Sequence, residues 1–424
     1  MNLQQTKSAV LNGAFDKDFN ILYGETESAR ERYAAACDAF CEIYGERDNI
    51  SLFSAPGRTE VGGNHTDHQH GRVLTGSVNL DVIAVVSPND ENIVRIKSAG
   101  YDMDTVDLND TSAKKGEAGM AISLIRGMCD IFKLNGYAVS GFDAYTTSNV
   151  LKGSGLSSSA AFEVLIGNIL NGMFNNSSVS AVEIAKISQK AERDYFGKPC
   201  GLLDQMASSV GGFCGMDFKN PAEPVIEKVD FNITDYAHSL CIVNTGGNHA
   251  NLTDDYADIT VECKKISNAL GKEFLRDVDE GQFYNSIAML REKCGDRAVL
   301  RAIHFFGDNY KALAEKEALK AGNFNEFLSL INASGDSSFM YLQNVYSNSN
   351  VSEQGISLAL AVTKKFLGNK GACRVHGGGF AGTIQAFVPN DMVEAYRTEI
   401  EKVFGKGSCY VLNIRSVGGY ALKA

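Results

Sequence analysis

A glycine-rich stretch, Ser54–Asp67 (SAPGRTEVGGNHTD), constrains the fold and the chemistry of this chain more than any other segment. It places Arg58, His65 and Asp67 within ten residues, and three glycines let the backbone bend around them. A carboxylate, an imidazole and a guanidinium held side by side suit a buried ligand that is rich in hydroxyl groups and has negative charge nearby. The stretch therefore predicts a binding site for a polar small molecule.

A second glycine-rich segment, Gly153–Ala160 (GSGLSSSA), lies between a predicted strand and a predicted helix. Its two glycines permit a close approach of the backbone to a ligand, and the serines that follow offer donors at a helix start, where the dipole favours an anion. A serine-rich helix cap after a glycine turn is the alternative. The segment is not a Walker loop, because the chain contains no Gly-x-x-x-x-Gly-Lys-Ser/Thr. The candidate phosphate ligands are Gly153, Gly155, Ser157, Ser158 and Ser159.

Two acidic residues frame the short connection that follows. Glu192 closes a predicted helix, where a glutamate is usually a solvated surface residue. Asp204 has apolar neighbours on both sides, where an aspartate is either a helix cap or a functional acid. Mg²⁺ prefers oxygen ligands, and phosphoryl transfer benefits from a carboxylate that orients the acceptor hydroxyl. Both residues are therefore candidates for such chemistry, with the structural alternatives open.

A third glycine motif, Gly377–Gly382, formally fits the dinucleotide-binding fingerprint. That fingerprint requires a helix directly after it, whereas Thr383–Val388 has the pattern of a strand. The motif therefore predicts a glycine-rich hairpin.

Helical and strand patterns follow one another irregularly, so we predict the α+β class rather than a Rossmann sheet. We expect a helix over 26–46, a β-hairpin made of 82–87 and 93–97, and a mostly helical region over 281–332. At 424 residues the chain exceeds the usual size of one domain, so two lobes are expected.

Together the three glycine motifs resemble those of the galactokinases, which belong to the GHMP small-molecule kinase superfamily, and they are spread over nearly the whole chain. The resemblance implies a two-lobed α+β fold with the active site between the lobes. It implies an N-terminal domain over 1–215, which holds the first two motifs, and a C-terminal domain over 216–424. It also implies a sugar 1-kinase that uses ATP and Mg²⁺, with galactose as the first candidate substrate.

The resemblance also implies roles for the catalytic residues. Asp204 matches the family's catalytic aspartate, which acts as a base or positions the anomeric hydroxyl. Arg58 matches the arginine beside it, which stabilises the charge of the transferring group. Glu192 and Ser158 match the residues that hold Mg²⁺. The third motif matches the segment that closes over the phosphate loop.

The sugar-binding residues match less completely. His65 and Asp67 match residues that contact the sugar, and Tyr256 lies where the family has a sugar-contacting tyrosine. Galactokinases usually carry a glutamate at the position of Asn64, facing the C6 hydroxyl of the sugar. An amide can donate to a C6 carboxylate that a glutamate would repel. A galacturonate 1-kinase is therefore the alternative, and the pattern His65–Gln69 also resembles that of galacturonate kinases.

Two further functions come from other classes. A non-catalytic sugar sensor of the galactokinase type is disfavoured because the residues matching the loop serines and the catalytic residues are present. A GHMP kinase for a non-sugar alcohol such as mevalonate is disfavoured by the sugar-binding signature His65–Asp67.

The composition limits the partners and the location. A formal net charge of −11 argues against nucleic acid or an anionic membrane surface. The first residues form no apolar signal segment and no apolar run is long enough to span a bilayer, so a cytoplasmic location is expected. The expected partner is a small-molecule sugar, and the oligomeric state is left open.

Overall fold

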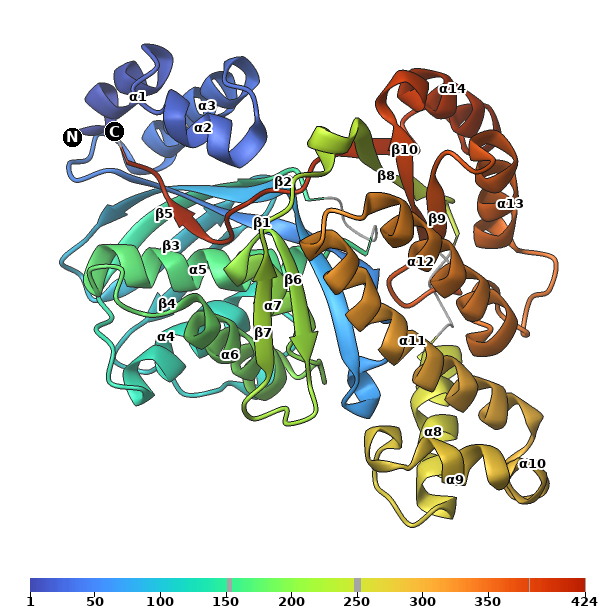
Figure 1. The fold of residues 1–424 in the computed structure, drawn as a ribbon. Helices are drawn as coiled ribbons and strands as arrows, with labels where there is room; N and C mark the ends of the chain where they lie inside the picture. The colour runs from blue at the N-terminus through green and yellow to red at the C-terminus, as the bar shows by residue number, and fades with distance from the viewer. Residues whose placement is uncertain (151–154, 248–252, 381, 424) are drawn as a thin grey trace.

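Two β-sheets, one in each lobe, organise the chain (Figure 1). The computed structural model describes residues 1–150, 155–247, 253–380 and 382–423. Gly153, one of the predicted phosphate ligands, lies outside these residues. The mixture of helices and strands confirms the predicted α+β class.

The first sheet has eight strands in the order β12-β1-β2-β5-β3-β4, with β6 paired to β2 and β7 to β6. Its described pairs are antiparallel except for β3 with β5. The strands are β1 (Ser51–Gly62), β2 (Arg72–Pro88), β3 (Ile93–Ser98), β4 (Met103–Asp107), β5 (Phe142–Ser148), β6 (Phe213–Asp217), β7 (Val225–Val229) and β12 (Tyr420–Ala421).

Helices cover both faces of this sheet, and the sequence of β1 and β2 shows why. Leu52 and Ile83 pack with the N-terminal helices on one face, whereas the next residues, Phe53 and Ala84, pack on the other face. Successive side chains of a strand point to opposite faces, so a continuous apolar run marks a strand that is buried on both sides. One face carries α1 (Leu3–Leu11), α2 (Asp16–Tyr23) and α3 (Glu27–Tyr44); the other carries α4 (Ala121–Leu134), α5 (Ser158–Phe174), α6 (Ala181–Ala191) and α7 (Leu203–Val210).

The second lobe contains a four-stranded antiparallel sheet in the order β11-β8-β10-β9. Its strands are β8 (His238–Asn244), β9 (Ala372–His376), β10 (Thr383–Pro389) and β11 (Cys409–Leu412), and α12 (Phe324–Ser337), α13 (Gly355–Leu367) and α14 (Val393–Phe404) accompany it. A helical group with its own core consists of α8 (Thr253–Ala269), α9 (Glu280–Asn285), α10 (Ile287–Cys294) and α11 (Asp296–Lys320).

Several predictions of secondary structure are confirmed. The predicted helix over 26–46 is α3, the region 281–332 is mostly helical, and the third glycine motif joins β9 to β10 as a hairpin. The hairpin predicted from 82–87 and 93–97 is wrong. Both segments are strands, but β5 pairs with each of them and lies between them. Local sequence could not reveal this, because β5 is supplied by a distant part of the chain.

The change from one sheet to the other occurs after β7 and before β8. The predicted domain boundary at 215 falls inside β6, which belongs to the first sheet, and β12 returns to that sheet from the C-terminus. The domain limits stay a prediction. Among the helices of the described residues, none has both the length and the apolar composition needed to cross a bilayer.

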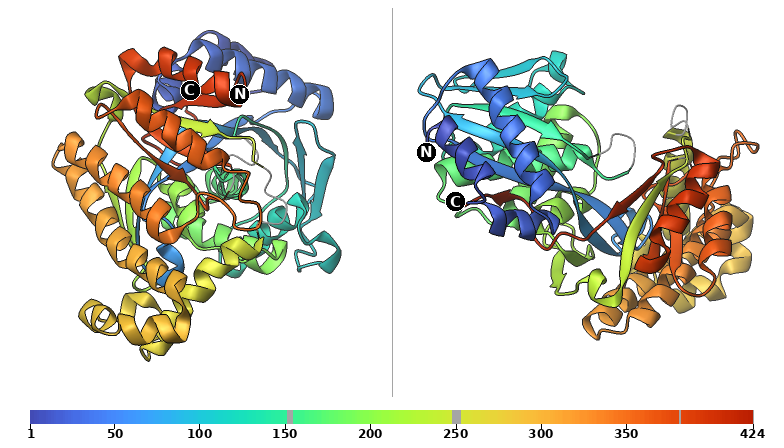
Figure 2. Two further views of the ribbon diagram at one scale, coloured as in Figure 1. Left: turned by 90° about the vertical axis from the view of Figure 1, so that its right-hand side faces the viewer. Right: turned by 90° about the horizontal axis from the view of Figure 1, so that it is seen from above.

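The far end of β1 meets the second sheet through buried polar contacts. Thr59 Oγ1 donates to Gln385 Oε1 (3.1 Å). Gln385 Nε2 donates to the carbonyls of Glu60 (2.9 Å) and Val61 (3.0 Å), and Arg374 Nη1 donates to the Val61 carbonyl (2.8 Å). Because buried polar groups are nearly always paired, these bonds fix the two lobes against each other around β1. Figure 2 shows the lobes side by side from above.

A buried carboxylate on β2 holds the first lobe to its N- and C-terminal segments. Asp81 accepts hydrogen bonds from Tyr23 (2.6 Å), Arg32 (2.5 Å) and Ser54, and Arg415 lies 3.2 Å away. Burial alone would raise the pKa of Asp81, but Arg32 and Arg415 outweigh it, so this pKa lies below its ordinary value.

Replacing Asp81 by asparagine should strongly destabilise the protein, because the buried guanidinium of Arg415 loses its counter-charge. We expect a loss of about 3 kcal/mol in the free energy of unfolding, measured by urea denaturation. Asp38→Asn is the control, since Asp38 is 58% exposed and only meets Lys7 at the surface. The stabilisation should be present above about pH 3.9 and disappear as the pH falls through the lower folded-state pKa. Equal effects of the two substitutions would contradict this role.

Candidate active site

An ion pair joins two motifs that are far apart in the sequence. Arg58 lies on β1 and Asp204 is the second residue of α7. Arg58 Nε and Nη2 lie 2.8 Å and 2.7 Å from Asp204 Oδ1. Arg58 also donates to the carbonyl of Gly155 in the phosphate loop. The pair therefore connects the first motif, the predicted catalytic aspartate and the second motif.

The surroundings of Asp204 favour its deprotonated carboxylate form. Burial alone would raise its pKa, but the charge of Arg58 and a hydrogen bond from Ser157 Oγ (2.5 Å to Oδ2) outweigh it, so the pKa lies below its ordinary value. Its side chain keeps 34% of its surface exposed. A deprotonated, accessible carboxylate can accept a hydrogen bond from a bound hydroxyl.

A cavity of about 390 Å³ lies beside this pair. It brings together five residues predicted from the sequence: Arg58, His65, Asp67, Asp204 and Tyr256. They come from β1, the loop after it, α7 and α8, so only the folded chain places them side by side. The remaining walls are formed by Glu60, His68, residues 198–201, Leu203, Gly377 and Gly378.

The third glycine motif shapes this cavity. His65 Nε2 lies 2.9 Å from the carbonyl oxygen of Gly378. A carbonyl only accepts, so Nε2 carries the proton and Nδ1 remains an acceptor. Burial, reinforced by His68, lowers the pKa of His65 to about 4. Tyr256 donates to the Gly379 carbonyl (2.9 Å), and a Cβ on Gly378 would lie 2.2 Å from the tyrosine ring, so glycine is required there.

Asn64 takes a different place from the one expected. It is fully buried, and the residues that line the cavity do not include it. Its Nδ2 donates to Glu60 Oε1 and to the Gly377 carbonyl, both at 2.8 Å. Its Oδ1 accepts from Asn344 (2.8 Å) and Ser338 (3.3 Å). The amide is thus occupied within the protein, and its predicted contact with the sugar stays a prediction.

The second motif enters α5 through left-handed backbone. Gly155 has φ +72° and Ser157 has φ +54°, a conformation that glycine adopts freely and serine rarely. Ser158 and Ser159 then open α5, whose N-terminus favours an anion. Both line a cavity of about 670 Å³ that also has an apolar wall, a combination able to hold a nucleotide. That wall includes Val82, Tyr101, Met120, Leu124, Phe162 and Phe196.

Glu192 lies beside the start of α5, with its carboxylate held from two sides. Oε1 accepts from Ser159 Oγ (3.1 Å) and Lys198 Nζ (2.9 Å), and Oε2 accepts from Gln205 Nε2 (2.7 Å). Carboxylate and hydroxyl oxygens are donors that Mg²⁺ prefers, so Glu192 and the serines at the start of α5 fit that ion. The metal role of Glu192 and Ser158 stays a prediction.

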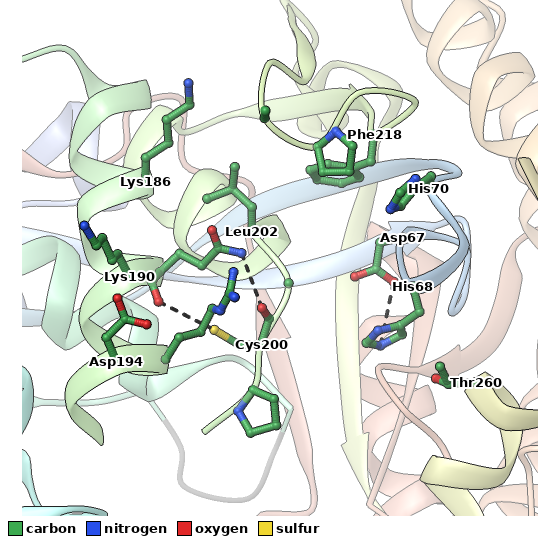
Figure 3. A pocket seen from close by; sticks show the side chains of 16 residues that line it. Asp67, His68, His70, Lys186, Lys190, Asp194, Cys200, Leu202, Phe218 and Thr260 are labelled. Carbon is green, nitrogen blue, oxygen red and sulfur yellow. Dashed lines mark hydrogen bonds and ion pairs between the residues drawn. The ribbon is translucent and has the colours of Figure 1, made fainter. Parts of the chain in front are cut away.

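A larger cavity of about 970 Å³ adjoins the cavity beside the Arg58–Asp204 pair (Figure 3). The two cavities share Asp67, His68 and residues 199–201. The outer wall carries Lys186, Lys190 and Arg193, from α6 and the turn after it. The same lining also contains the carboxylates of Asp67 and Asp194, so the wall is of mixed charge.

Several residues of the site were not predicted, among them Glu60, Lys198 and Gln205. Glu60 follows Arg58 by two positions in one strand, so a period of two places both on the same face. That spacing was a usable signal. Lys198 and Gln205 contact Glu192 only in the folded protein, where the loop between α6 and α7 brings them together. No local sequence pattern predicts these contacts.

Family models match two parts of the chain. The model for the GHMP kinases N terminal domain matches residues 121–212, and the galactokinase galactose-binding signature matches residues 38–88. Galactokinase from Lactobacillus helveticus is 29% identical over 83% of this chain and 89% of its own length. Galactokinase from Glaesserella parasuis serovar 5 is 28% identical over 87% and 92%.

Solved structures share the fold. The structure of Lactococcus lactis galactokinase complexed with galactose has a TM-score of 0.76 and 24% identity, over 92% of this chain and 99% of that one. Mevalonate kinase from L. major, in complex with R-mevalonate, has a TM-score of 0.57 and 14% identity, over 86% and 96%. Both likenesses support the two-lobed GHMP kinase fold.

Acidification should destabilise the protein through His65. The folded ring binds a proton near pH 4, whereas the unfolded ring does so near pH 6.5. The unfolded state therefore holds more protons in between, and stability falls as the pH drops through this window. His65→Gln should reduce the slope of the unfolding free energy against pH by the contribution of about one proton. Denaturation at pH values from 4 to 6.5 measures this slope. His238→Gln is the control, and an unchanged slope for His65→Gln would refute this account.

Proposed function

The chain belongs to the galactokinases of the GHMP kinase superfamily, and we propose that it transfers the γ-phosphoryl group of ATP to the anomeric hydroxyl of galactose. One observation carries the proposal. The Arg58–Asp204 pair contacts both sides of the reaction, since it lines the sugar cavity and bonds to Gly155 and Ser157 of the phosphate loop. The phosphoryl donor, ATP, and the acceptor sugar would therefore meet at this pair.

The sugar would lie in the cavity of about 390 Å³. Asp67 supports this by offering a carboxylate to ring hydroxyls, and His65 by offering the Nδ1 acceptor described above. Tyr256 supplies a wall, held by its hydrogen bond to the Gly379 carbonyl and packed against Gly378. Fixed acceptors of this kind orient a polyol without needing to rearrange on binding.

ATP would occupy the neighbouring cavity, with its phosphates at the start of α5 by Gly155, Ser157, Ser158 and Ser159. We assign Glu192 and Ser158 to Mg²⁺, on the oxygen donors beside this helix start. The ion, when bound, neutralises charge on the phosphate oxygens.

Asp204 would orient the anomeric hydroxyl and receive its proton as the new O–P bond forms and the bond to ADP breaks. Its low pKa makes it a weak base, which suits a loose transition state in which the proton leaves late. Arg58 and the N-terminus of α5 would stabilise the charge of the transferring group.

The other candidates are less well supported. The galacturonate 1-kinase was suggested by the pattern His65–Gln69 and by the amide of Asn64, and this amide is occupied by partners within the protein. A non-catalytic sensor does not need the paired and accessible Asp204. We place the reaction in the cytoplasm, where ATP is available and the ten free cysteines would stay reduced.

Asp204→Asn should lower kcat by about 100-fold or more, because the carboxylate that orients the hydroxyl and accepts its proton is lost. The Kd for ATP should stay the same, as measured by calorimetry, and turnover is followed by coupled release of ADP. Asp296→Asn, an exposed change at the start of α11, is the control. Retention of most of the wild-type rate by Asp204→Asn would show that the catalytic assignment is wrong.

Glu192→Gln should raise the Mg²⁺ concentration for half-maximal turnover by about tenfold, because a neutral amide is a poorer ligand. Glu163→Gln is a matched control. Glu163 contacts the same Gln205 (3.2 Å), and burial raises its pKa well above the ordinary value, so glutamine mimics its neutral form. Equal Mg²⁺ requirements in both variants would exclude Glu192 as a ligand.

A further inference from the structure

Glu60 is a carboxylate on the wall of the sugar cavity that the motif comparison did not single out. It lies on β1 two residues after Arg58, so both side chains emerge from the same face of the strand. Its side chain is only 11% exposed. Burying a carboxylate costs desolvation free energy unless hydrogen bonds and a nearby positive charge compensate it, and Glu60 has both.

Two partners fix one oxygen of this carboxylate. Oε1 accepts from Arg374 Nη2 (2.9 Å) and Asn64 Nδ2 (2.8 Å). Arg374 is fully buried behind the wall, so its charge is directed to Glu60 rather than to a ligand. Burial raises the pKa of Glu60 above its ordinary value, and the charges of Arg374 and Arg58 oppose this only in part. Among the described residues, no hydrogen bond reaches Oε2, which leaves this oxygen as an acceptor.

We propose that Glu60 determines specificity, by accepting a hydrogen bond from a hydroxyl of a neutral sugar and by repelling a sugar acid. The proposal rests on the proposed function and identifies its substrate class as neutral hexoses. Asn64 then acts as a positioning residue, because its amide donates to Glu60 and is itself held by Asn344.

The charges around the cavity favour the same conclusion. Its charged lining residues are the cations Arg58 and Lys198 and the carboxylates Glu60, Asp67 and Asp204. Arg58 is paired with Asp204, and Lys198 is paired with Glu192. Among the described residues of this lining, no lysine or arginine is left unpaired for a uronate, and like charges placed together in a desolvated site cost several kcal/mol.

Glu60→Gln tests the proposal, because it keeps the shape and removes the charge. We expect kcat/KM for galactose to fall and the ratio of galacturonate to galactose kcat/KM to rise about tenfold or more. Glu315→Gln is the control. Glu315 is fully buried and is absent from the cavity lining, and burial raises its pKa well above the ordinary value, so glutamine resembles the protonated form that burial favours. An unchanged ratio in Glu60→Gln would overturn the proposal.

A second measurement uses the wild-type protein and needs no substitution. Calorimetry should show that galacturonamide, which is neutral, binds about tenfold or more tightly than galacturonate. Equal or tighter binding of galacturonate would overturn the role of Glu60. Failure of the wild type to phosphorylate galactose, while it still binds ATP and discriminates the amide from the acid, would instead refute the proposed function and leave the specificity intact.

Discussion

The antiparallel pairing of β1 with β2 is the constraint on which the rest of the structure depends. Every residue of β1 after the first is buried, so the strand runs through the protein from the core of the first lobe to the second sheet. Ser54 meets Asp81 near its start, and Arg58 and Glu60 emerge at the cavity. The ladder fixes the register, and the register decides which side chains face the site.

Pairing of buried charges is the second organising principle. Three carboxylates of the site each have a cation beside them: Asp204 has Arg58, Glu60 has Arg374 and Glu192 has Lys198. A buried charge without a partner would cost several kcal/mol, so these pairs let a polar site exist between two lobes. They also hold the site in position before any ligand arrives, which lowers the cost of reorganisation during reaction.

Much of the fold was predictable because its signals are local. Helical periodicity gave α3, and the strand after the third glycine motif excluded a dinucleotide fold. The hairpin wrongly predicted over 82–97 shows the limit of prediction from local sequence patterns. Two strands joined by a turn look like a hairpin in sequence, but β5 competes successfully for the edge of β3 from a distant position. Strand pairing depends on non-local packing, which a short pattern does not contain.

The sequence by itself determined the chemical inventory: the glycine motifs that permit close backbone approach, and the arginine, histidine and aspartates between which a sugar and phosphates can be held. Only the tertiary structure decided how these groups are used. Asn64 and Glu60 are four residues apart, yet one is fully buried and the other lines the cavity. Their roles are set by Arg374 and Asn344, which come from the other lobe. A side chain's partners, rather than its type, determine whether it can bind a ligand.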